Sequence, residues 1–195
     1  MERTTGILLP IFSLPSNQGI GDFGKHTYRL IDAIAKQHIH IWQILPLNPV
    51  GYGNSPYQPY SSFAGDELYI SIDTLADYGL LKQSSIRNYN KFSERVDYEG
   101  VRKFKEPYLR KAFKTFQEFE QEYQLFTSQS EWLYPYAVFI TLKKQNDDKP
   151  WQQWPKEQRE WIIDRHYSLQ SLENEIGYRL FERNKGFRNA NITVQ

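Results

Sequence analysis

The chain has 195 residues, with 24 basic and 23 acidic side chains and a formal net charge of +1. Hydrophobic residues make up 39% and charged residues 24%, which is typical of a globular protein and not of a disordered one. The balanced charge gives no electrostatic footprint for nucleic acid or an anionic membrane, and the absence of cysteine excludes disulfides, thiolate metal sites and a cysteine nucleophile.

The first apolar run, ILLPIFSL, is interrupted by Pro10 and lacks the small-residue pattern of a cleavage site. No window approaches the roughly 20 apolar residues that a membrane span needs. We therefore expect a soluble, cytoplasmic protein with no membrane or nucleic-acid partner.

Residues 6–13, GILLPIFS, predict a short buried strand, and HIHIWQILPL at 38–47 predicts a second one. Between them Asp22 is expected to be the N-cap of an amphipathic helix. The helical spacing is carried by Thr27, Leu30, Ile31, Ile34, Ala35 and His38. Strand, helix and strand form a βαβ unit, which implies a parallel sheet.

In parallel α/β folds, functional residues gather in the loops beyond the carboxyl ends of the strands. Two loops qualify, at residues 14–22 and 46–66. The second is rich in proline, glycine and aromatic residues. Since proline fixes φ, Pro46, Pro49, Pro56 and Pro59 would hold the loop's tyrosines in position before a ligand arrives.

The rest of the chain predicts a strand-like run and a helical turn after residue 66, and then mostly helix from Val96 onward. Pro107 is expected at the start of a helix, and Ser128 with Glu131 resembles a capping box. Apolar stripes are formed by Leu109, Ala112, Phe113, Phe116 and Phe119, and later by Leu169, Leu172, Ile176 and Leu180. We expect a βαβ portion at 1–66, a mostly helical subdomain at 67–183 and an irregular tail at 184–195.

Two segments carry a family resemblance: LLPIFSLPSNQGIGDFG at 8–24 and WQILPLNPVGYGNSPYQPYSSFAG at 42–65. They resemble the 4-α-glucanotransferase (amylomaltase, or disproportionating enzyme) family of the α-amylase-like clan. Weaker matches at 96–101 and 136–155 extend the resemblance to about residue 180. The sequence departs from the family at Asn54, where Asp is usual, and at Asp66-Glu67, where Asn-Pro is commoner.

The resemblance implies the start of a (β/α)8 TIM-type barrel, with its first two strands and a helical inserted subdomain. A barrel of this type takes about 250 residues, so the barrel is expected to be incomplete in this chain. The family's aspartate nucleophile, glutamate acid/base and third aspartate would lie outside the chain, so we assign it no catalytic residue.

The activity implied is transfer of α-1,4-glucan segments between maltooligosaccharides, with retention through a covalent glycosyl-enzyme. The partner would be a maltooligosaccharide or a starch-type α-glucan, and no cofactor or metal is implied. The sequence does not predict the oligomeric state.

Four residues are expected to bind substrate: Tyr57, Gln58, Ser55 and Tyr52. The ring of Tyr57 would offer an apolar face to the reacting sugar and a negative π face to a developing oxocarbenium ion. Gln58 and Ser55 can donate to and accept from sugar hydroxyls. Tyr52, between two glycines, could stack on a glucan farther from the reaction. The alternative is that these residues only pack and brace the loop.

Other polar residues favour structural roles. Asp66 and Glu67 are adjacent, so their side chains are expected to point in different directions. Arg102 and Lys103 are expected to be solvated charges on the face of a helix. The histidines, His26, His38, His40 and His166, have no convincing metal-ligand spacing. Two rival functions stay open: a non-catalytic glucan-binding module and an inactive truncated product.

Overall fold

The computed structural model describes residues 3–91, 94–116, 127–164 and 167–190. The chain divides into two compact units, one formed by residues 1–118 and 185–195 and the other by residues 119–184. The domain boundaries expected at 66 and 183 stay predictions. Within the described residues, no helix is both long and apolar enough to cross a membrane.

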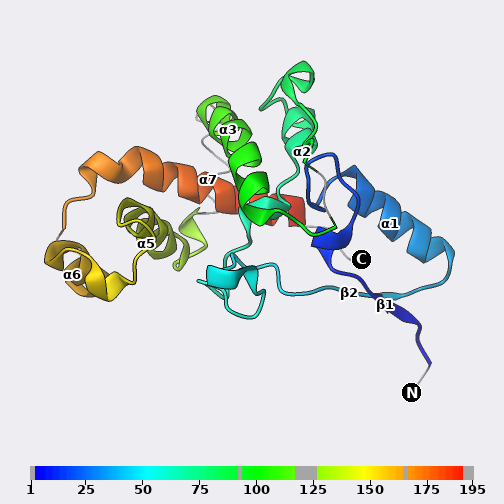
Figure 1. Ribbon diagram of the computed structural model, residues 1–195, viewed down its shortest axis with the longest axis horizontal. Coiled ribbons are helices and arrows are strands. Elements are labelled where there is room, and N and C mark those ends of the chain that lie inside the picture. Colours follow the sequence, from blue (N-terminus) through cyan, green and yellow to red (C-terminus); the bar gives the residue numbers. More distant parts are fainter. Residues whose placement is uncertain (1–2, 92–93, 117–126, 165–166, 191–195) are drawn as a thin grey trace. The chain divides into compact units, whose positions relative to one another are not determined.

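The first unit contains the predicted βαβ arrangement. β1 (Gly6–Leu8) and β2 (Ile41–Gln43) pair in parallel, with Ile7 opposite Trp42, and α1 (Lys25–Lys36) connects them (Figure 1). The parallel pairing confirms the prediction. β1 is shorter than expected because Pro10 has no N–H to donate, and a 3-10 turn, η1 (Ile11–Ser13), follows it.

The strands are not buried as predicted. Leu8 is 58% and Ile41 51% exposed. Within the described residues these two strands pair only with each other, and the face of the sheet that carries Leu8 and Ile41 is exposed.

The segment that leads into α1 is tightly packed. A Cβ on Gly21 would overlap the carbonyl oxygen of Ile11, so no larger residue fits there without movement of the backbone. The N-cap of α1 is Gly24 and not Asp22, which corrects the prediction. Asp22 is buried and instead accepts a hydrogen bond from Lys105 Nζ.

After the loop that follows β2, the chain forms η3 (Glu67–Tyr69), α2 (Ile72–Asp77) and η4 (Gln83–Ser85). The predicted strand-like run was wrong, whereas the helical turn is present. Side chains explain the difference: the Asp66 carboxylate accepts from Leu68 N, and Ser71 Oγ accepts from Thr74 N. These local hydrogen bonds favour turns over the predicted β-strand.

α3 (Tyr98–Phe116) supplies much of the first unit's interior. Pro107 lies inside this helix and not at its start, because Asp97 caps the N-terminus by accepting from Gly100 N. The buried stripe of α3 comprises Val101, Lys105, Leu109, Ala112 and Phe116. Phe119, predicted to continue the stripe, lies outside the described residues. A buried cluster joins Val101 to Ile20, Leu68 and Tyr89.

The second unit is helical. α5 (Leu133–Gln145), η5 (Trp151–Gln153), α6 (Lys156–Asp164), η6 (Gln170–Leu172) and α7 (Glu173–Ala190) follow one another, and α7 ends in the part of the chain assigned to the first unit. Its core contains Leu133, Ala137, Val138, Leu142, Trp154, Trp161, Ile176 and Leu180. The later leucine stripe was therefore predicted correctly.

Two local predictions were wrong in this region. The N-cap of α5 is Trp132, with no side-chain cap, so Ser128 and Glu131 do not form a capping box there. Residues 184–190 are helical where an irregular tail was expected. That helix continues the buried Ile176–Leu180 turn, and Lys185 contributes a packed contact, 4.2 Å from the centre of the Phe116 ring.

Candidate substrate-binding loop

Residues 47–66, called here the 47–66 loop, follow β2 and return to their starting point. Asp66 N donates to Leu47 O at 2.7 Å, and Asn48 Nδ2 donates to Ala64 O at 3.0 Å. These two bonds close the base of the loop, so its two arms run side by side.

The upper part of the loop is a small hairpin. Val50 and Pro59 form an antiparallel bridge, Gly51 N donates to Gln58 O at 3.4 Å, and Tyr60 N donates to Pro49 O at 3.1 Å. The tip contains the η2 turn (Tyr52–Asn54) and adopts left-handed backbone at Gly53, with φ of 84°. The predicted bracing is thus made by backbone hydrogen bonds as well as by proline.

Three of the four predicted substrate residues lie in one turn at the tip. Tyr57 is 71% exposed, Gln58 is exposed, and Ser55 is half-buried. Ser55 Oγ accepts from Tyr57 N at 3.4 Å, and Gln58 N donates to Ser55 O at 3.2 Å. The Tyr52 side chain lies outside the described residues, so its assignment stays a prediction.

The loop exposes two rings in addition to the predicted Tyr57. Phe63 is 73% and Tyr60 42% exposed, in addition to Tyr57. Flat apolar faces of this kind pack against the C–H surfaces of sugars, and tyrosine hydroxyls can bond their hydroxyl groups. The signal for Phe63 was available: it is a large apolar residue in a polar, glycine-bounded segment.

The 14–22 loop, the other predicted functional loop, lines a polar pocket of about 400 Å³ in the first unit. The pocket is lined by Ser16, Asn17, Asp22, Lys25, His26, Arg29, Ser71, Asp73, Gln83, Ile86 and Asn88. It has cations and carboxylates on its walls and no Phe, Tyr or Trp side chain, so it differs in character from the 47–66 loop.

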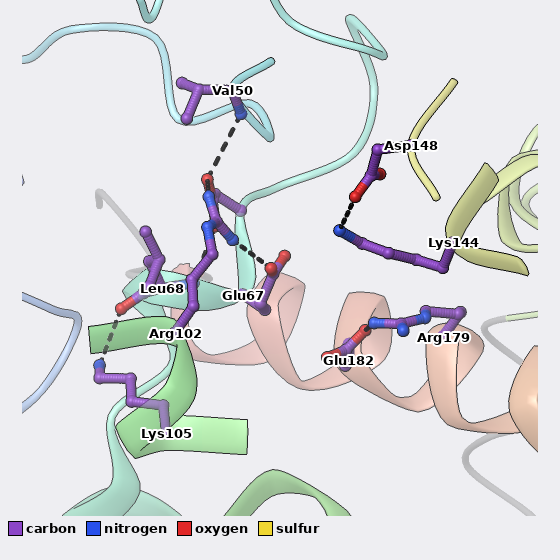
Figure 2. A network of polar contacts seen from close by, with 10 residues as sticks. Val50, Glu67, Leu68, Arg102, Lys105, Lys144, Asp148, Arg179 and Glu182 are labelled. Carbon is purple, nitrogen blue, oxygen red and sulfur yellow. Dashed lines mark hydrogen bonds and ion pairs between the residues drawn. The ribbon is translucent and has the colours of Figure 1, made fainter. Parts of the chain in front are cut away.

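The carboxylates at the end of the loop were predicted wrongly. Asp66 and Glu67 do not point apart but both contact Arg102, and Arg102 is not a solvated surface charge (Figure 2). Asp66 is 3% exposed, and its two oxygens accept from Arg102 Nη1 at 3.1 Å and Nη2 at 2.8 Å. Burial and the adjacent Glu67 raise the pKa of Asp66, while Arg102 opposes this rise.

A fully buried cation lies three residues farther along α3 than Arg102. Lys105 is 1% exposed and donates to Leu68 O at 2.8 Å, Ile70 O at 2.9 Å and Asp22 Oδ2 at 3.2 Å. Burial lowers the pKa of Lys105 and raises the pKa of Asp22, and the charge of each partner opposes the shift of the other. The sequence carried one signal for this site, since a lysine occupies a position in an apolar helical stripe.

No cluster of three or more metal-ligating side chains occurs among the described residues. His38 has left-handed backbone with φ of 58°, directly after α1, and His166 lies outside the described residues. His26 lines the polar pocket described above.

A parallel βαβ unit, with a braced and ring-bearing loop after its second strand, is typical of the α/β class, in which functional residues gather in the loops at the carboxyl ends of the strands. The family model described as 4-alpha-glucanotransferase matches residues 9–187, and the chain belongs to that family.

Relatives and solved structures agree with this membership. The chain is 38% identical to the 4-alpha-glucanotransferase of Synechocystis sp. over 96% of its own length, and 39% identical to that of Aquifex aeolicus over 80%. It spans 39% and 32% of the lengths of these two relatives. The structure matches amylomaltase from Streptococcus agalactiae in complex with acarbose with a TM-score of 0.86 and 30% identity, covering 96% of this chain and 39% of that one. A match to amylomaltase from Corynebacterium glutamicum, with a TM-score of 0.70 and 16% identity, supports the fold alone.

Proposed function

We propose that the chain forms the N-terminal portion of a 4-α-glucanotransferase, which moves α-1,4-glucan segments between maltooligosaccharides with retention. Family membership supports the activity. Because the chain spans 39% of the length of its Synechocystis relative, we assign the catalytic carboxylates to the part of the enzyme beyond it. In this proposal β1 and β2 are the first two strands of a (β/α)8 barrel, and residues 67–183 form a mostly helical subdomain inserted after them.

The role of this portion is to form part of the substrate-binding wall. Tyr57, Gln58 and Ser55 contact the sugar, and Tyr52 stacks on the glucan farther along. Ser55 also supports the turn through its bonds with Tyr57 N and Gln58 N. The observation that carries the proposal is the exposure of Tyr57, which is 71%, on a loop whose backbone is braced at its base and tip. A ring that only packed the loop would be covered by it. The acarbose bound to the amylomaltase of Streptococcus agalactiae supports an α-glucan as the ligand class.

The test uses an enzyme that spans the full family length and contains this sequence. Tyr57→Ala should lower kcat/KM for maltotriose by at least about tenfold, or about 1.4 kcal/mol, because it removes the ring. Tyr57→Phe should have a mild effect because the ring face remains. Tyr78→Ala is the control, since Tyr78 is 53% exposed at the end of α2 and lies outside the loop. Unchanged kinetics in Tyr57→Ala would reduce Tyr57 to a loop-packing residue.

A further inference from the structure

We propose that Arg102, together with Asp66 and Glu67, is a positioning cluster that fixes the conformation of the 47–66 loop and so places Tyr57. The inference rests on the proposed function, since it adds three supporting residues to the site described there. All three lie within the first unit, and none of them is expected to touch the substrate.

The argument begins at the base of the loop. Asp66 is the residue where the loop returns, and it joins both arms. Its backbone N–H donates to Leu47 O at 2.7 Å, and its Oδ2 accepts from Val50 N at 3.4 Å. One residue therefore fixes two points on the outgoing arm.

The side chain of Asp66 makes these contacts as an ionised carboxylate. Oδ1 accepts from Leu68 N at 2.9 Å and from Arg102 Nη1 at 3.1 Å, and Oδ2 accepts from Val50 N and from Arg102 Nη2. All four partners are donors, so a protonated carboxyl would lose an acceptor position. A buried carboxylate with this pattern needs a fixed counter-charge, and the two-pronged guanidinium of Arg102 supplies it.

The hydrogen bond between Val50 and Asp66 links the base of the loop to its tip. Val50 donates to Asp66 and also forms the antiparallel bridge with Pro59. Pro59 directly follows Gln58, whose carbonyl accepts from Gly51 N and whose N–H donates to Ser55 O. A shift of Val50 would therefore move the turn that holds Tyr57.

Glu67 adds a second negative charge that Arg102 neutralises at the base of the loop. Its carboxylate also contacts Arg102 Nη1, so two adjacent negative charges face one guanidinium, whose side chain is 30% exposed (Figure 2). Without the guanidinium, the two carboxylates would repel each other beside the buried end of the loop. Arg102 thus stabilises an arrangement that its partners alone would not adopt.

Three variants separate the charge of Arg102 from its geometry. Arg102→Gln removes the charge, and Arg102→Lys keeps the charge but not the two-pronged donor. Lys103→Gln is the matched control, because Lys103 is the next residue of α3, its side chain is 81% exposed, and its nearest carboxylate, that of Glu99, is 3.9 Å away. This control changes the net charge as Arg102→Gln does, without touching the loop.

The first measurement is amide hydrogen exchange, followed peptide by peptide in the 195-residue chain. In Arg102→Gln we expect exchange over residues 47–60 to rise by at least about tenfold, with exchange over 104–116 of α3 unchanged. Arg102→Lys should give a smaller rise, and Lys103→Gln none. Unchanged exchange in the loop, or an equal rise in α3, would overturn the proposal, since the latter is the mark of a generally destabilised unit.

The second measurement is a double-mutant cycle in the full-length enzyme with maltotriose. If Arg102 affects activity by positioning Tyr57, Arg102→Gln should lower kcat/KM by about tenfold in the parent enzyme. The same substitution should have little effect in an enzyme that already carries Tyr57→Ala. Equal effects in both backgrounds would contradict the proposal. If Tyr57→Ala alone has no effect, the proposed function of Tyr57 fails, whereas hydrogen exchange still decides whether Arg102 positions the loop.

Discussion

Lys105 Nζ lies 3.2 Å from Asp22 Oδ2, although the two residues are 83 positions apart in the chain. Both side chains are buried, and together they join α3 to the segment that leads into α1. Lys105 also holds the carbonyls of Leu68 and Ile70, which directly follow the 47–66 loop. This pair and the Arg102 cluster therefore connect three separate parts of the chain around one helix.

Removing the lysine should strongly destabilise the first unit. We expect Lys105→Met to cost about 3–5 kcal/mol, because it leaves the Asp22 carboxylate buried without a counter-charge. Adding Asp22→Asn should recover part of that loss, since the remaining buried group is then neutral. Protection of the α3 amides from hydrogen exchange measures both effects. Lys103→Met, on the exposed face of α3, is the control and should change the free energy of unfolding by no more than about 0.5 kcal/mol. An equally large loss of stability in this variant would show that the buried position of Lys105 is not the cause.

The cap of α3 should give the first unit a measurable pH dependence. Hydrogen bonds from Gly100 N and the Tyr89 hydroxyl, each 2.9 Å long, lower the pKa of Asp97. A lowered pKa means that the cap's contribution is complete above the ordinary value of 3.8 and is lost as the pH falls through the folded-state value.

Asp97→Asn should therefore be less stable than the parent at pH 6, and the difference should shrink as the solution is acidified below about pH 3.8. The stability difference is measured by unfolding both proteins in urea at several pH values and monitoring amide hydrogen exchange in α3. Glu99→Gln, whose parent side chain is 84% exposed, is the control and should show no such convergence. A pH-independent difference for Asp97→Asn would contradict the assignment.

The tip of the loop should depend on Gly53. Its φ of 84° lies in the left-handed region, which costs a residue with a Cβ about 1 kcal/mol or more, although there is open space around the position. Gly53→Ala should accelerate exchange in residues 50–60. Gly65→Ala is the matched control, because a Cβ there also meets nothing and its φ is not positive. Equal behaviour of the two variants would show that the tip tolerates another backbone conformation.

The 195-residue chain by itself should not transfer glucan. This expectation follows from the assignment of the catalytic carboxylates to the rest of the enzyme, since loss of such groups costs many powers of ten in rate. Incubation with maltotriose should release no glucose and form no longer oligomers at enzyme-like rates. Turnover comparable to that of a complete transferase would refute the assignment, and binding without turnover would favour a glucan-binding module.

The small sheet should promote association between copies of the chain. Leu8 is 58% and Ile41 51% exposed on strands that, within the described residues, pair only with each other. Unpaired strand edges with apolar side chains invite further pairing. Sedimentation should show concentration-dependent association that Leu8→Lys reduces and Tyr28→Lys, on α1, does not. A monodisperse monomer at all concentrations would argue against this.

The βαβ order, the helical character after residue 96, the family and the loop that carries Tyr57 could all be predicted from the sequence, because periodicity and short motifs are local properties. The apolar stripes expected within residues 109–116 and 169–180 also pack in the two units, whereas the stripe expected on α1 buries only Thr27 and leaves Ala35 and His38 exposed. Whether Tyr57 and Gln58 bind substrate remains a prediction that these local features support.

The partners of the charged residues follow from tertiary contacts and not from local sequence. Asp66 and Arg102 are 36 positions apart, and Lys105 meets Asp22 across 83, so no local pattern could pair them. The same limit explains why the local sequence predicts a solvated charge at Arg102 and a helix cap at Asp22. The burial of a charge depends on which segments the fold brings together. For Arg102 and Asp22, the long-range contacts of α3 determine their environment.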